Sequence, residues 1–289
     1  MEITKAVIPA AGFGTRILPA TKAMPKEMYP IIDKPAIQYI VEEAVKSGIT
    51  DILIITNRGK VVIEDHFDKS PELELELEKK QKAEILKAVR PISSLANFYF
   101  IRQKEAKGLG HAVKCAKSFV SKEPFAVLYG DDVTVSQEPV CLQLIRAYTK
   151  YGIGVVGAKE MPRSEISKYG SLKVQNIEKN YYKCTDMIEK PTPDKVMSLF
   201  SILGRCVLPP KIFDILDNTS PGTGGEIQLT DAMKVLAQTE GMIAVDFEGK
   251  RYDIGNKLGI AKAVVEIALT HPEISEDFKK YLKNLGNQL

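Results

Sequence analysis

The sequence has no tryptophan, and its 289 residues include few histidines and few cysteines. The four cysteines, Cys115, Cys141, Cys184 and Cys206, each lie more than twenty residues from the next, so they form no Cys-x-x-Cys pair. This spacing supports neither a zinc cluster nor a dense disulfide framework, and it predicts reduced thiols in the cytoplasm. The three histidines form no obvious set with serine and aspartate, so a Ser-His-Asp nucleophile is not indicated.

Long apolar runs and a large excess of one charge are also missing. No apolar stretch approaches the ~20 residues that a membrane span needs, and the run at residues 6–12 begins only after Glu2 and Lys5. The 40 basic residues are dispersed among 37 acidic ones, which gives a formal net charge of +3 and no footprint for a polyanion. We therefore expect a cytoplasmic protein with no membrane and no nucleic acid partner.

What remains is the composition of an ordinary globular protein, with 44% hydrophobic and 27% charged residues. A chain of this length buries roughly 75% of its extended surface on folding, which is enough for one large core. No Ser/Gly-rich linker and no internal repeat divides the chain. A single domain is therefore expected.

The first half of the chain alternates short apolar runs with segments of helical periodicity. The patterns predict strands at residues 6–11, 52–55, 98–101 and 125–129, and helices at residues 37–45 and 112–120. Successive strand, helix and strand units imply right-handed parallel crossovers. We therefore expect an α/β fold, a Rossmann-like doubly wound mixed and mainly parallel sheet with helices on both faces.

In the second half the patterns differ: they predict shorter strands, at residues 153–158 and 203–208, between loops that contain proline and glycine. We interpret them as small β additions to the same sheet. Helical patterns follow at residues 226–238 and 257–269, so the chain is expected to end in helices. Residues 72–78 alternate with period two but consist of good helix formers, and we expect a solvated helix there.

A glycine-containing loop at residues 9–16 directly follows the first predicted strand. Its backbone amides can face an anion while Arg16 adds a planar cation, at the sheet edge where α/β proteins bind ligands. The dinucleotide fingerprint is incomplete, because Ile17 stands where the third glycine belongs, and no Walker sequence follows. The loop favours a phosphate site, and the alternative is a tight turn that needs glycine only for steric reasons.

Other polar residues follow the predicted strands. Asp131 comes directly after a buried strand, where its carboxylate could bind Mg²⁺ or form an Asx turn. Gln103 follows another strand and could present a donor and an acceptor to a uracil edge, or simply be solvated. Lys22 and Lys26 lie in a proline-punctuated loop, and Glu189 with Lys190 reads by itself as an exposed ion pair. These residues alone leave both readings open.

Together the motifs resemble those of a known family. AAGFGTR at residues 10–16 and PKEMYPIIDKPAIQYIVEE at residues 25–43 are similar to the signature of bacterial UTP:glucose-1-phosphate uridylyltransferases, or UDP-glucose pyrophosphorylases. These belong to the sugar-phosphate nucleotidylyltransferase family. The resemblance runs nearly end to end, with further matching segments at residues 107–112, 130–132, 169–170, 189–191, 204–205, 224–231 and 252–255.

The resemblance implies a Mg²⁺-dependent transfer from UTP to glucose 1-phosphate that yields UDP-glucose and pyrophosphate. The attacking phosphate oxygen is already anionic, so such a reaction needs no general base. The alternatives are a thymidylyltransferase on the same scaffold and a non-catalytic sugar-nucleotide sensor. The resemblance also suggests a homodimer or homotetramer. It divides the chain into a nucleotide-binding half at about residues 1–150, a sugar-binding half at about 151–255, and C-terminal helices at about 256–289.

The resemblance assigns a role to each matching position. The implied catalytic cations are Arg16, Lys26 and Lys190. The implied nucleotide contacts are Ala10, Ala11, Gly12, Gly14, Thr15, Gln103 and Gly108. The implied sugar contacts are Gly170, Glu189, Lys190 and Glu226, and the implied metal ligands are Asp131 and Asp253. The roles of Asp132 and Glu226 stay open, since Glu226 also reads as a helix N-terminus. Cys206 departs from the aromatic residue of many relatives, which leaves the choice of sugar open.

Overall fold

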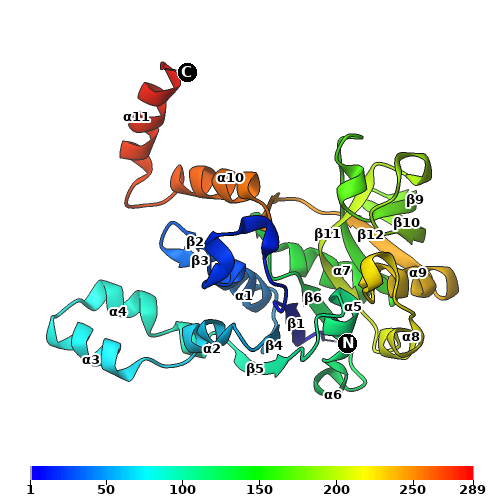
Figure 1. The fold of residues 1–289 in the computed structure, drawn as a ribbon, viewed down its shortest axis with the longest axis horizontal. Helices are drawn as coiled ribbons and strands as arrows, with labels where there is room; N and C mark the ends of the chain where they lie inside the picture. Colours follow the sequence, from blue (N-terminus) through cyan, green and yellow to red (C-terminus); the bar gives the residue numbers. More distant parts are fainter. Residues whose placement is uncertain (1, 289) are drawn as a thin grey trace.

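The computed structural model describes residues 2–288, which form a mixed nine-stranded sheet with helices on both faces (Figure 1). The expected α/β fold is confirmed. The strands are β1 Lys5–Pro9, β2 Pro30–Ile31, β3 Lys34–Pro35, β4 Asp51–Thr56, β5 Asn97–Arg102, β6 Phe125–Leu128, β7 Asp132–Val135, β8 Gly154–Glu160, β9 Ser171–Glu178, β10 Tyr181–Ile188, β11 Phe200–Leu208, β12 Met242–Asp246 and β13 Lys250–Asp253.

The α-helices include the ones predicted at residues 37–45 and 257–269, and several that the sequence did not predict. They are α1 Ala36–Lys46, α2 Val61–Phe67, α3 Pro71–Lys79, α4 Ala83–Val89, α5 Leu109–Lys114, α6 Lys117–Val120, α7 Val140–Tyr151, α8 Ile212–Asn218, α9 Leu229–Thr239, α10 Lys257–Ala268 and α11 Ser275–Gly286. Short 3₁₀ turns interrupt the loops. Within residues 2–288, no helix combines the length and the apolar character that a bilayer crossing demands.

The order of strands in the large sheet is β5-β4-β1-β6-β11-β8-β12-β10-β9. The side formed by β5, β4, β1 and β6 is parallel throughout. Beyond it, β11 runs antiparallel to both of its neighbours β6 and β8, and β10 runs antiparallel to β12 and β9. The second half of the chain therefore extends the same sheet, as we expected from its short predicted strands. It does so largely through antiparallel pairings.

Side chains alternate between two cores, one on each face of the sheet. On β1, Ile8 packs into the core beneath α1, whereas Val7 packs into the opposite core beneath α9. On β4, Ile54 and Leu53 divide in the same way. Because successive strand residues point to opposite faces, a nearly continuous apolar run serves both cores. This explains why these strands lack the polar alternation of a half-exposed sheet.

The structure confirms one of three further predictions about helices and contradicts the other two. Residues 71–79 form a helix with no buried residue, as expected for the solvated segment. The predicted helix at 112–120 is wrong as one element, because the chain breaks it into α5 and α6. The predicted start of a helix at Glu226 is also wrong: Glu226 has an extended backbone with φ −98° and ψ 146°, and α9 begins at Leu229.

Candidate active site

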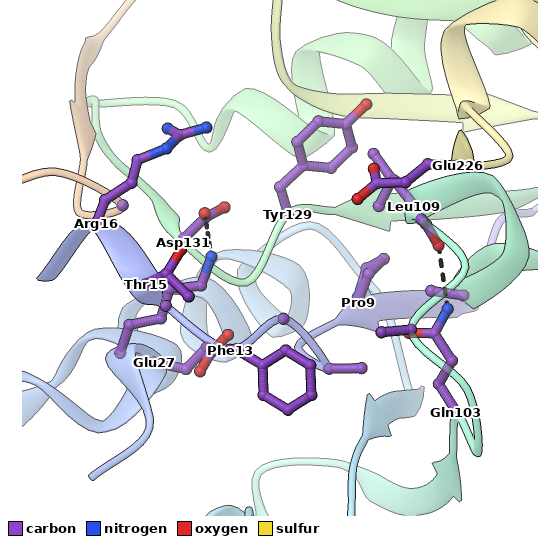
Figure 2. Close-up of a pocket in the computed structure, with 18 of the residues that line it drawn as sticks. Pro9, Phe13, Thr15, Arg16, Glu27, Gln103, Leu109, Tyr129, Asp131 and Glu226 are labelled. Atoms are coloured by element: carbon purple, nitrogen blue, oxygen red, sulfur yellow. Dashed lines mark hydrogen bonds and ion pairs between the residues drawn. The ribbon is translucent and has the colours of Figure 1, made fainter. Parts of the chain in front are cut away.

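A cavity of about 490 Å³ opens where several strands of the large sheet end (Figure 2). In this view Thr15, Arg16 and Asp131 lie on one side, Gln103, Leu109 and Glu226 on the other, and Tyr129 between them. A smaller cavity of about 140 Å³ shares part of this wall and continues toward Tyr169, Gly170, Arg251 and Asp253. All of the predicted site residues except Ala10 line one of the two cavities. Ala10 is buried beneath the loop, with 1% of its surface exposed.

The glycine loop between β1 and the 3₁₀ turn Thr15–Ile17 is held through its carbonyl oxygens. Lys60 donates to the carbonyl of Ala10, Asn57 Nδ2 donates to that of Ala11 at 2.6 Å, and Thr21 Oγ1 donates to that of Gly14 at 2.7 Å. A trans peptide directs its N–H opposite to its C=O. The bound oxygens therefore turn the amides of the next residues away from these three side chains.

The amides of the glycine loop remain available to a ligand. Within residues 2–288, the backbone N–H groups of residues 11–16 donate no hydrogen bond to another protein group. Gly12 lies close to Lys26, since a Cβ placed on Gly12 would be 3.9 Å from Lys26 Nζ. The loop thus offers free donors next to a fixed cation, which is the arrangement that binds phosphate in other backbone nests.

A buried ion pair supports the loop from beneath. Lys60 Nζ lies 2.7 Å from Glu27 Oε2, and the two side chains are only 6% and 1% exposed. Burial lowers the pKa of Lys60 although Glu27 opposes this, and burial raises the pKa of Glu27 although Lys60 and Lys26 oppose it. Neither Asn57 nor Lys60 is among the residues predicted from the sequence. Their only signal was a position in the loop directly after β4.

The carboxylates of Asp131 and Asp253 both line the smaller cavity. Strand β13 pairs with β7, and Ile254 donates from its backbone to the carbonyl of Asp131 at 3.0 Å. A Cβ placed on Gly255 would lie 2.9 Å from Asp253 Oδ1 and 3.0 Å from Asp131 Oδ2. A side chain at this position would press on both carboxylates. The two predicted metal ligands are therefore neighbours.

Lys26 is bound to one of these carboxylates, with Nζ 2.5 Å from Asp131 Oδ2. Burial disfavours the charge on Lys26, but Asp131, Glu27 and Asp253 outweigh burial and raise the pKa of Lys26. Burial likewise disfavours the charge on Asp131, but Lys26 outweighs it and lowers the pKa of Asp131. Both groups are therefore charged at neutral pH.

The donor set suits a hard cation that shares its ligands with a substrate. Across residues 2–288, no three side chains of His, Cys, Asp or Glu are grouped as a metal site of their own. Two convergent carboxylates nevertheless match Mg²⁺, which typically takes one or two carboxylates and completes its shell with water and substrate phosphates. The residues present therefore fit such an ion.

Asp132, whose role the sequence left open, is turned into the protein. Its side chain is 2% exposed, and its Oδ2 accepts a hydrogen bond from Arg251 Nε at 2.6 Å. Burial raises the pKa of Asp132 although Arg251 and Arg205 oppose it. Arg251 also lies over the ring of Tyr169, with 4.9 Å to the centroid, and Tyr169 donates to Asp253 Oδ2 at 3.3 Å. Asp132 therefore helps to fix the strand that carries Asp253.

Gln103 is fixed at the opposite end of the cavity. Its amide nitrogen donates to the carbonyl of Gly108 at 3.1 Å, the contact drawn in Figure 2, and lies 2.9 Å from His111 Nδ1. The sequence predicts that Gln103 presents both a donor and an acceptor. The structure differs, because the NH₂ group is engaged within the protein and the amide oxygen is the group left for a ligand.

The predicted sugar contacts lie between these two ends. Thr230 donates to Glu189 Oε2 at 2.7 Å, and a Cβ on Gly170 would lie 3.3 Å from the same oxygen. Lys190 is 46% exposed, and its Nζ is 3.9 Å from Glu189 Oε1. Glu226 packs against Gly108, where a Cβ would approach it to 2.6 Å. Cys206 lies in β11 with 1% exposure and lines neither cavity.

Comparisons with known proteins identify the family of the chain. The family model described as Nucleotidyl transferase matches residues 5–269. The chain is 51% identical over 284 residues to a UTP–glucose-1-phosphate uridylyltransferase of Staphylococcus epidermidis, which covers 98% of this chain and 99% of the relative.

Solved structures are similar over the same length. A UDP-glucose pyrophosphorylase complexed with UDP-glucose has a TM-score of 0.87 and 41% identity, covering 93% of this chain and 100% of the other. A UTP-bound UGPase from Acinetobacter baumannii has a TM-score of 0.90 and 38% identity, covering 98% and 100%. The similarity thus includes both the sequence and the arrangement of the strands that surround the cavities.

Proposed function

The chain belongs to the nucleotidyl transferase family, and from this membership we propose that it transfers the uridylyl group of UTP to α-D-glucose 1-phosphate, releasing pyrophosphate and forming UDP-glucose. The names of its relatives support this choice of substrates. The observation that carries the proposal is the convergence of Lys26, Asp131 and Asp253 beside the free amides of the glycine loop.

The main physical difficulty of this reaction is charge repulsion. UTP carries about four negative charges and the sugar phosphate about two, and two like charges 4 Å apart repel by about 4 kcal/mol at an effective dielectric constant of 20. Arg16, Lys26 and Lys190 surround the joined cavities and supply three positive charges. Positioning and charge stabilisation are most of what phosphoryl chemistry asks of a protein.

The residues also divide between nucleotide and sugar. In the proposal the amides of Ala11, Gly12, Gly14 and Thr15, above the buried Ala10, bind the UTP phosphates. Gln103 and Gly108 bind the uracil. Glu189 and Glu226 accept hydrogen bonds from sugar hydroxyls, Gly170 leaves room for the ring, and Lys190 binds the anomeric phosphate. Its anionic oxygen attacks the α-phosphorus in line with the departing pyrophosphate, and no general base is needed.

Members of this family generally use a divalent metal, and we propose Mg²⁺ held by Asp131 and Asp253. When bound, the ion would neutralise phosphate charge and help to orient the nucleotide. Lys26 keeps the carboxylate of Asp131 ionised and therefore ready to bind the ion. This assignment is supported by the approach of both carboxylates to Gly255.

The proposal extends to organisation. Residues 1–150 would bind the nucleotide and residues 151–255 the sugar, in a cytoplasmic enzyme. The C-terminal helices of residues 256–289 would join copies into a homodimer or homotetramer. In support, α11 has no buried residue among those described and extends from the body of the molecule, with Tyr281 58% exposed (Figure 1).

Pyrophosphate release tests the proposed function. The protein is incubated with Mg²⁺, one nucleoside triphosphate and one sugar 1-phosphate at a time, and we expect UTP with glucose 1-phosphate to be the best pair and EDTA to abolish turnover. Preference for dTTP would instead indicate a thymidylyltransferase. Tight binding of UDP-glucose without any turnover would indicate a sensor, and the proposal would be wrong.

A further inference from the structure

We propose that His111 is a positioning residue that fixes the amide orientation of Gln103 and thereby makes the site select uracil over cytosine. The inference rests on the proposed function, in which the base of the nucleotide lies against Gln103. Neither the family model nor the relatives' names assign a role to His111. Three neighbouring groups determine this role through their hydrogen bonds: the carbonyl of Gly108, the amide of Gln103 and the imidazole of His111.

The carbonyl of Gly108 fixes which atom of the Gln103 amide is the nitrogen and which is the oxygen. The carbonyl oxygen of Gly108 can only accept a hydrogen bond. The Gln103 atom that lies 3.1 Å from it must therefore be the NH₂ nitrogen. The same nitrogen lies 2.9 Å from His111 Nδ1, so its second hydrogen points at the imidazole ring.

This second contact fixes the state of the histidine. Nδ1 must accept the hydrogen bond, so the ring is neutral and carries its proton on Nε2. Burial lowers the pKa of His111, and Lys107 lowers it further although Glu105 opposes this. The neutral ring, which can accept, is therefore the prevailing form at neutral pH. His111 lies in α5, whose N-cap and C-cap residues are Gly108 and Cys115.

Both hydrogens of the NH₂ group are thus used inside the protein. A flip of the amide would place its oxygen against the carbonyl of Gly108 and the lone pair of His111 Nδ1, and would lose both hydrogen bonds. The side chain is 8% exposed, so water cannot readily replace them. Gln103 can therefore offer the cavity only its oxygen, which is an acceptor.

An acceptor at this point distinguishes the pyrimidines. Uracil carries an N–H at its imide position and can donate to the Gln103 oxygen. Cytosine has an unprotonated ring nitrogen there, so two acceptors would face each other. A site that is built to hydrogen-bond one group strongly rejects an analogue that lacks it. Without His111, Gln103 retains a single internal hydrogen bond and can turn more easily to suit cytosine.

The test compares UTP and CTP in the variant His111→Phe, which keeps a ring but removes the acceptor. We expect kcat/KM for CTP relative to that for UTP to rise about ten-fold over the wild type. The matched control is His66→Phe, which removes a comparable histidine–glutamine contact, His66 Nε2 to Gln38 Oε1 at 2.9 Å, remote from both cavities. The control should leave the ratio unchanged.

A purely structural role for His111 would reduce UTP and CTP turnover alike, so an unchanged ratio in a folded His111→Phe protein overturns the inference. The variant His111→Gln restores an acceptor and should return the ratio toward the wild-type value. Binding of UMP and CMP by calorimetry gives the same ratio without turnover. A wild type that releases no pyrophosphate would therefore refute the proposed function while still allowing the His111 inference to be tested.

Discussion

Lys26 and Lys190, which the resemblance assigns to the same catalytic role, have different surroundings in the structure. Lys26 is tied to Asp131 at 2.5 Å, whereas Lys190 is nearly half exposed and has only a long contact to Glu189. Lys190 also has φ 42°, a left-handed conformation that costs a residue with a side chain about 1 kcal/mol or more. Such strain at a cavity edge is typical of a functional position. Lys26 is thus preorganised, and Lys190 is free to reach a ligand.

Replacing Lys190 with alanine should weaken the use of glucose 1-phosphate by about 1.5 to 3 kcal/mol, the size of a hydrogen bond to a charged group. The measurement is kcat/KM for the sugar phosphate at saturating UTP. The exposed Lys195 nearby serves as the matched control, and Lys195→Ala should behave like the wild type. Unchanged kinetics in Lys190→Ala would remove its assigned role.

A second prediction concerns the support of the glycine loop. The variant Asn57→Asp replaces the donor NH₂ group that faces the carbonyl of Ala11 with a carboxylate oxygen, which repels that carbonyl. We therefore expect the peptide between Ala11 and Gly12 to rotate, which also changes the direction of the Gly12 N–H. We expect UTP and inorganic tripolyphosphate to bind more weakly by about 1 to 3 kcal/mol, as calorimetry would show. The surface change Asn176→Asp controls for the added charge. Equal affinities in the two variants would contradict this account of the loop.

At the level of elements, the small β7–β13 pair brings the two carboxylates together, and a buried cluster fixes it. Arg205 is 1% exposed and donates to both carboxylate oxygens of Glu43 at 3.0 and 2.7 Å, and to the carbonyl of Asp132 at 2.9 Å. Burial disfavours the charge on Arg205, but Glu43 outweighs it and raises the pKa of Arg205. Removing one partner of such a pair would leave an uncompensated buried charge.

Gly204 allows β11 to approach β7. Its φ is +61°, and a Cβ there would lie 2.3 Å from Asp132 Cγ. Gly204→Ala should therefore combine backbone strain of about 1 kcal/mol with a clash that costs about 1 to 3 kcal/mol. It should also lower activity by displacing Asp131. Urea denaturation and the pyrophosphate assay measure the two effects.

Gly152 offers a matched control for this substitution. Its φ of +69° is similar, but a Cβ there meets nothing within 4 Å. Gly152→Ala should show the backbone strain alone and retain full activity. If both alanine variants lose the same stability, then the close approach of Gly204 to Asp132 has no energetic consequence.

For the molecule as a whole, the charged and buried groups predict a loss of stability in acid. Burial lowers the pKa of His66, and burial and Lys107 lower that of His111. The unfolded chain therefore takes up protons near the ordinary value of 6.5 that the folded chain does not bind. Stability is fully present above this value and falls as the pH decreases below it.

A second acid step follows from surface carboxylates. Hydrogen bonds from Lys150 and Lys117 lower the pKa values of Glu178 and Asp217 below the ordinary 4.5 and 3.8. Their contribution is present above these values and is lost as the pH falls through the lowered ones. Urea denaturation between pH ~7.5 and ~3 should show both steps, with the lower one weakened by salt, while the raised pKa values of Glu27 and Asp132 act with the opposite sign. An equal loss of stability between pH ~7 and ~5 in the wild type and in His66→Phe would contradict the contribution assigned to this histidine.

The elements that could be predicted are those whose signals are local. The apolar run that forms β1, the helical spacing of α1 and the turn-forming glycines act over a few neighbouring residues. The break between α5 and α6 and the extended backbone at Glu226 could not be read this way. Glu226 packs against Gly108, a residue more than one hundred positions away in the chain, and short-range patterns do not contain such a contact.

Sequence patterns alone were enough to predict several of the buried strands, some of the helices and the set of charged residues that phosphate chemistry requires. The contacts of Lys26 with Asp131 and of Arg205 with Glu43, and the support of the glycine loop by Asn57 and Lys60, are seen only in the folded protein. The physical reason is range: periodicity and turns depend on adjacent residues, whereas these contacts join segments that meet only after the sheet has formed. Charge and amide orientation at the site are therefore properties of the folded chain.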